Sequence, residues 1–224
     1  MSLALISQTP AAAADGDLDT SFSGDGILVQ DLHASGEDGW ESVVFDGDGN
    51  LIAGGWWNNN GQTGKHSWSI NRHTAAGTCT DAVKFDNNCG TQRFWSPRKD
   101  HISEILVQPN GKIVAVGSAG TNGNEPGGDY DCTVTRFGKT KNFQELDTGF
   151  GSGGIVRPGF QSAKHDYCKG AALDSNNKIV VVGYVKHGGS RYDATIARLN
   201  TDGSLDTSFA SNGKRTEHFD NDDI

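Results

Sequence analysis

The chain has 224 residues, with 31 glycines, 5 prolines and a formal net charge of −9. This length is enough to bury a sizeable core, and the glycine-rich, proline-poor composition favours short strands joined by tight turns over helices or disorder. The acidic balance, without a cluster of lysines and arginines, argues against nucleic-acid binding, and no apolar run is long enough to span a membrane.

The first fifteen residues resemble the end of a secretory signal peptide. A short apolar run from Met1 to Ile6 precedes the small residues Ala11 to Ala14, which are typical of a cleavage region. A basic n-region is missing, so a disordered leader is the alternative. We expect residues 1–15 to be a leader or signal-peptide remnant, and residues 16–224 to form a single repeat domain.

The first predicted structural element is the segment LDTSFSGDGILV, which begins at Leu18 and recurs along the chain. It returns as LDTGFGSGGIV from Leu146 and LDTSFASNGKR from Leu205, with a degraded copy, FDNNCGTQRF, from Phe85. Each copy ends in a run that predicts a closing strand, and these runs lie near residues 26–32, 91–96, 153–160 and 213–219.

The next element is a β-hairpin that occurs three times, at residues 38–55, 100–117 and 166–183. The middles of the three segments read VVFDGDGNLIAGG, ILVQPNGKIVAVG and AALDSNNKIVVVG. Each is an apolar run, a polar turn and a second apolar run that ends at glycine, which is the pattern of a hairpin. A third strand follows each hairpin, at residues 67–72, 131–137 and 193–199.

These elements repeat with a period of about sixty residues and four strands. Asp38 and Asp100 are 62 residues apart, and Leu146 and Leu205 are 59 apart. A four-stranded antiparallel unit cannot bury both faces alone, so the copies are expected to stack face to face as β-propeller blades in an all-β fold. The continuous apolar runs at 113–116 and 179–182 agree with strands covered on both faces. A sandwich or a β-helix is the alternative.

The motifs resemble the delta-60 repeat family of bacterial β-propeller proteins. The stretches that carry the resemblance are ILVQPNGKIVAVG from Ile105, ATIARLNTDGSLDTSF from Ala194 and LDTGFGSGG from Leu146. Residues 56–95 depart most from the pattern. The resemblance covers residues 16–224 and implies a propeller fold and an envelope or extracellular location, with no catalytic residues.

Four closing strands accompany three hairpins, so the sequence predicts three blades plus a spare strand near residues 26–32. Propellers have about four to eight blades. Two assemblies satisfy this requirement: further blades in a longer chain, or a homodimer that completes a six-bladed ring.

The four cysteines fit an exported protein if they form disulfides. Cys79 and Cys89 flank a polar loop, whereas Cys132 and Cys168 need the fold to bring them together, and four cysteines allow three pairings. Four buried or unreacted thiols are the alternative.

Three groups of residues are candidates for binding sites. Asp46, Asp48 and Asn50 resemble the start of a calcium loop, which makes a structural Ca²⁺ an alternative to a plain turn and to the absence of any cofactor. Equivalent aspartates begin the hairpins and can surround a channel mouth or cap turns. A third group combines aromatic planes with amides, the chemistry of a sugar-binding surface, and packing of the tryptophans between blades is the alternative. The second group consists of Asp38, Asp100 and Asp166, and the third consists of Trp56, Trp57, Asn58 and Asn59.

No nucleophile elbow, phosphate loop or metal-ligand spacing of histidines is present, so no catalytic residue is identified from the sequence. The leading hypothesis is a non-enzymatic, exported repeat scaffold for binding or adhesion at the bacterial surface. A carbohydrate-binding, lectin-like propeller module is the alternative, and a glycan-active hydrolase or lyase is a third hypothesis.

Overall fold

The computed structural model describes eight stretches of the chain, together with the backbone of three short strands within residues 84–93. The eight stretches are residues 16–30, 37–58, 66–79, 100–120, 130–138, 145–160, 165–187 and 191–218. Every regular element in them is a strand. The predicted leader, residues 1–15, lies outside the described residues. No helix that could span a membrane occurs in the stretches that the structure describes.

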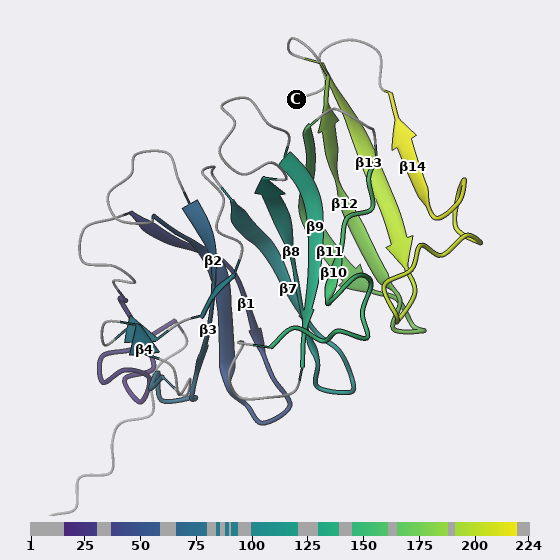
Figure 1. Ribbon diagram of the computed structural model, residues 1–224. Helices are drawn as coiled ribbons and strands as arrows, with labels where there is room; N and C mark the ends of the chain where they lie inside the picture. The colour runs from purple at the N-terminus through teal and green to yellow at the C-terminus, as the bar shows by residue number, and fades with distance from the viewer. Residues whose placement is uncertain are drawn as a thin grey trace, which may run out of the picture.

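The strands form three four-stranded antiparallel sheets, which stand face to face in Figure 1. Blade 1 consists of β1 (Asp38–Phe45), β2 (Leu51–Asn58), β3 (His66–His73) and β6 (Thr91–Arg93). Blade 2 consists of β7 (His101–Val107), β8 (Ile113–Gly120), β9 (Tyr130–Phe137) and β10 (Ile155–Val156). Blade 3 consists of β11 (His165–Leu173), β12 (Ile179–Lys186), β13 (Tyr192–Leu199) and β14 (Lys214–Glu217). The all-β fold of three propeller blades is therefore confirmed.

A two-stranded hairpin of β4 (Lys84–Phe85) and β5 (Asn88–Cys89) precedes the last strand of blade 1. It lies in the degraded copy of the closing segment, where the sequence departs most from the repeat. The predicted spare strand is not part of any of the sheets: residues 27–30 form no strand, and residues 31–32 lie outside the described residues. A closing strand pairs with the third strand of its own blade. In the described residues, no third strand precedes this segment for it to pair with.

Each blade carries a β-bulge in its first strand, opposite a glycine of the second strand. The register shifts between Trp40 and Ser42, and at the equivalent points in β7 and β11. A Cβ atom on Gly117, opposite the bulge of blade 2, would lie 2.0 Å from the carbonyl oxygen of His101. The glycine that ends each predicted apolar run is thus required by the close approach of the first strand.

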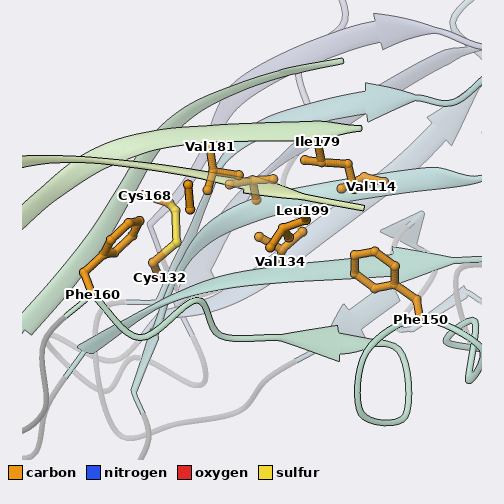
Figure 2. Packing of buried hydrophobic residues seen from close by; sticks show 11 residues of the cluster. Val114, Cys132, Val134, Phe150, Phe160, Cys168, Ile179, Val181 and Leu199 are labelled. Atoms are coloured by element: carbon orange, nitrogen blue, oxygen red, sulfur yellow. A yellow bond between two sulfur atoms is a disulfide. The ribbon is translucent and has the colours of Figure 1, made fainter. Parts of the chain in front are cut away.

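The hydrophobic core lies between the blades. One cluster joins blades 1 and 2 around Ile52, Ile70, Ile102 and Ile105. A second joins blades 2 and 3, and Figure 2 shows its packed side chains, including Val114, Val134, Val181 and Leu199. Stacked blades therefore bury apolar faces that no single sheet buries alone.

A disulfide between Cys132 of β9 and Cys168 of β11 joins blade 2 to blade 3 within this second cluster (Figure 2). This disulfide occurs in one of the three arrangements that four cysteines allow. Cys79 is also disulfide-bonded. The side chain of Cys89 lies outside the described residues.

Candidate functional site

A groove with a volume of about 350 Å³ crosses all three blades at one end of their strands. The described part of its walls carries five aromatic or imidazole rings and a single carboxylate. The lining residues are Glu41, Trp56, His66, His101, Tyr130 and Tyr167. The volume lies within the range of about 300–1,000 Å³ that is typical of small-molecule sites.

The repeat itself places these rings together. The first and third strands of each blade start at the same end, and the second strand finishes there, so residues at these three points are neighbours. His66, Tyr130 and Tyr192 are the first residues of β3, β9 and β13. His101 and Tyr167 each follow the aspartate that recurs in the repeat: Asp100 lies directly before β7, and Asp166 is the second residue of β11. Because blades stack, equivalent positions of successive blades form one lined surface.

The rings of the groove are ordered by contacts with one another. The Trp56 and His66 rings are stacked, with centroids 4.0 Å apart and an angle of 12° between their planes. Gly39 makes room for this stack, because a Cβ atom at that position would lie 2.9 Å from the indole. Tyr130 and Tyr167, which come from neighbouring blades, are stacked at 5.5 Å. The groove thus presents aromatic faces that are held in place before any ligand arrives.

The row of rings continues from the groove onto blade 3. Tyr167 and Tyr184 are 4.9 Å apart, and Tyr184 meets Tyr192 edge to face at 5.3 Å. Burial raises the pKa of the Tyr184 hydroxyl, and the neighbouring Tyr192 raises it further. Tyr184 therefore remains a neutral hydrogen-bonding group throughout the physiological pH range.

The predicted ligand-binding residues lie in different environments. Trp56 lines the groove, whereas Trp57 and Asn58 are buried, and Asn59 lies outside the described residues. Asp100 and Asp166 are also fully buried. Asp100 Oδ1 accepts a hydrogen bond from the Gly120 amide at 2.9 Å, and Asp166 Oδ2 accepts one from the Phe160 amide at 2.8 Å. Asp38 begins β1 and is half-buried. Ligand binding by these three aspartates stays a prediction.

Asp46, Asp48 and Asn50 form the turn of the first hairpin. Asp46 Oδ1 accepts hydrogen bonds from the amides of Asp48 and Asn50 at 3.0 and 2.9 Å, and Asp46 Oδ2 lies 3.2 Å from Arg72 Nε. Burial acts to raise the pKa of Asp46, but the bonds from Asn50 and Asp48 and the charge of Arg72 lower it overall. Among the described residues, no group of three or more acidic, histidine or cysteine side chains is arranged to hold a metal ion. A calcium ion at this turn stays a prediction.

Sequence reasoning missed five of the six groove residues. The available signal was the recurrence of a ring at the start of the third strand, which is histidine, tyrosine and tyrosine in the three blades. Glu41 is the extra residue of the β1 bulge, and no pattern of alternation predicts a bulge.

The comparisons with known proteins agree with this architecture. A family model described as a domain of unknown function (DUF5122), β-propeller, matches residues 175–209, which include β12, β13 and part of the closing segment of blade 3. The comparison with curated proteins found no match. The fold and the match together define the chain as a set of β-propeller repeats.

Proposed function

We propose that the protein is a non-enzymatic, exported binding module whose ligand is a carbohydrate held in the aromatic groove. The observation that supports this proposal most directly is the stack of Trp56 on His66 beside Tyr130 and Tyr167 in one groove. The apolar face of a pyranose ring packs on aromatic planes, and hydroxyl, imidazole and carboxylate groups at their edges bond the sugar hydroxyls.

The groove favours a sugar over a nucleic acid or a strongly anionic ligand. Among the described residues, its lining contains one carboxylate and no lysine or arginine, and the whole chain carries a formal charge of −9. Phosphate groups need clustered cations, and the described part of the lining has none. Binding or adhesion at a bacterial surface is a role that such a module would serve.

Export is supported by the disulfide that joins Cys132 to Cys168, because disulfides persist mainly in oxidising compartments. The signal-like residues 1–15 and the resemblance to the delta-60 repeat family point to the same location. For the completed ring, we propose either a second copy of the chain or further blades of a longer chain.

The test is binding of soluble polysaccharides and an immobilised glycan array, with Trp56→Ala as the decisive variant. Loss of the Trp56 ring is expected to weaken the best ligand by about tenfold or more, which corresponds to about 1.4 kcal/mol. Trp40→Ala is the matched control, because Trp40 is a partly exposed tryptophan of the same blade that does not line the groove.

An unchanged affinity in Trp56→Ala would refute the groove as the binding site, and the absence of any glycan ligand would refute the proposed ligand class. Chromatography of the same polysaccharides after incubation separates binding from cleavage. Shortened products would replace the binding proposal with the hydrolase or lyase hypothesis.

A further inference from the structure

Among the described residues, every large apolar side chain that is strongly exposed lies at one of the two ends of the blade stack. Val182 is 43% exposed on the last blade. Trp40, Val43 and Phe45 are 37%, 59% and 67% exposed on the first strand of blade 1. Leu18, Ile27 and Val29 belong to the closing segment that precedes blade 1. The surface between the two ends carries no such side chain in the described stretches.

The outer face of blade 3 repeats an interface that is buried inside the molecule. Strand register makes Val182 equivalent to Val116, because each lies opposite the residue that follows the bulge in its first strand. By the same register, Val180 and Ile196 are equivalent to Val114 and Val134. Those blade 2 residues are fully buried against blade 3. The exposed face of blade 3 therefore has the pattern that in blade 2 receives another blade.

The outer face of blade 1 is the matching half of the same interface. Trp40, Val43 and Phe45 are equivalent to Ile102, Ile105 and Val107 of blade 2. In blade 2, this row packs against blade 1 within the inter-blade cluster. Blade 3 thus exposes one half of the inter-blade interface and blade 1 exposes the other half. The chain already forms the complete interface twice, between blades 1 and 2 and between blades 2 and 3.

A closing loop connects neighbouring blades at the opposite end from the groove. Residues 146–154 of blade 2 contact the turn after the third strand of blade 3, where the Gly151 amide donates to the Asp202 carbonyl at 2.8 Å. Phe150 is fully buried there: the Arg136 guanidinium lies 4.5 Å from its ring, and a Cβ atom on Gly203 would lie 2.9 Å from it. Arg136 also donates to the Thr201 carbonyl.

The equivalent turn of blade 1 is occupied by the chain's own first closing loop, residues 18–26. The Ser23 amide donates to the Ala76 carbonyl at 3.1 Å, in the same relation as Gly151 to Asp202. A Cβ atom on Gly77 would lie 3.3 Å from the Phe22 ring. This first closing loop therefore occupies the site at the turn of blade 1 where the closing loop of a preceding blade would bind.

The third closing loop, residues 205–213, has the same conformation without a following blade. Phe22, Phe150 and Phe209 each donate an amide hydrogen bond to the aspartate three residues earlier, at 3.0, 2.9 and 2.9 Å. Ser23, Gly151 and Ala210 all have positive φ, at 53°, 55° and 46°. The third loop is already in the shape in which the other two are docked.

We propose that a second copy of this chain docks head to tail, and that its third closing loop exchanges with the first closing loop at the turn of blade 1. This inference rests on the proposed pairing of two copies. Both loops contain the sequence LDTSF, so the exchange replaces contacts of one kind with the same contacts. The net gain comes from covering Val182 with Trp40, Val43 and Phe45, and two such interfaces close a ring.

The first closing loop then acts as a built-in competitor of self-association. A loop tethered to the turn has a high effective concentration, so it weakens the docking of an identical loop from another molecule. Weakening the first loop is therefore expected to strengthen the dimer, a result that ordinary destabilisation of an interface does not give.

Sedimentation of the full chain over a range of concentrations tests the proposal. We expect a reversible dimer, a loss of affinity of at least tenfold in Val182→Asp, and a gain of at least threefold in Phe22→Ala. Val29→Asp is the matched control, because Val29 is 88% exposed and belongs to neither of the two rows that strand register aligns with the inter-blade interface. Circular dichroism confirms that each variant is folded.

A dimer that is unaffected or weakened by Phe22→Ala would overturn the loop exchange and leave the pairing intact. A monomer at all concentrations in the natural chain and in Phe22→Ala would overturn both, and would assign the end faces to further blades of a longer chain. Open-ended polymers would overturn the closed ring.

Discussion

Phe150 and Phe209 occupy equivalent positions, and their replacement by alanine measures what a following blade contributes. Phe150 is fully buried because the turn of blade 3 covers it, whereas Phe209 is partly exposed. The ring contact with arginine is the same in both, at 4.5 Å for Arg136 and 4.8 Å for Arg198. The two substitutions therefore differ mainly in the contact with the next blade.

Removal of a fully buried phenylalanine costs about 3–5 kcal/mol of unfolding free energy, so Phe150→Ala is expected to lose that amount. Phe209→Ala removes a ring that retains part of its solvent exposure, and about 1–2 kcal/mol is expected. Urea unfolding followed by tryptophan fluorescence, at a protein concentration below that of self-association, gives both values. Equal losses in the two variants would refute the docking of the closing loop on the following blade.

Three further predictions concern the cross-link, the bulge and the ion pairs. Replacing Cys132 and Cys168 with alanine opens a loop with a sequence separation of 36 residues. Urea unfolding is expected to give an unfolding free energy lower by about 3–4 kcal/mol. An unchanged midpoint would show that the cross-link does not stabilise the fold. Gly117→Ala places a Cβ atom 2.0 Å from a backbone oxygen and is expected to prevent or severely impair folding. In Gly170→Ala the nearest neighbour of the new Cβ atom lies at 3.5 Å, so this variant is expected to fold normally by circular dichroism. Similar behaviour of the two variants would contradict the close approach of the strands. Burial acts to raise the pKa of Asp147, but its bonds to Lys112 and Arg136 and their charges lower it overall. The contribution of Asp147 to stability is therefore complete above the unfolded pKa of about 3.9 and is lost as the pH falls through the lower folded value. Melting temperatures between about pH 5 and pH 2 are expected to fall less steeply in Asp147→Asn, and identical slopes would refute the assignment.

Most of the fold could be predicted from the sequence because the repeat is written in local patterns. The hairpins, third strands and closing segments each carry their own turn residues, so three blades follow from aligned stretches such as 100–117 and 166–183. The short hairpin of β4 and β5 has no counterpart in the sequence pattern, because the repeat is degraded there. The segment at 26–32 reads as a strand, but the described residues 27–30 lie in no sheet.

Much less of the candidate site could be predicted, because its residues come from three blades. Two adjacent tryptophans draw attention to Trp56 in the sequence, but only the structure shows that Trp56 lines the groove and that Trp57 is buried. Tyr130 and Tyr167 are neighbours only after stacking brings β9 against β11. The same holds for Cys132 and Cys168, whose pairing depends on the face that each blade turns to the next.

The disulfide across the seam between blades 2 and 3 also determines how the molecule bears a mechanical load. Tension applied to the two ends of the chain cannot extend the segment between residues 132 and 168, because the covalent bond carries the force past it. Blades 2 and 3 therefore stay covalently joined under tension, whereas this cross-link does not bridge the seam between blades 1 and 2.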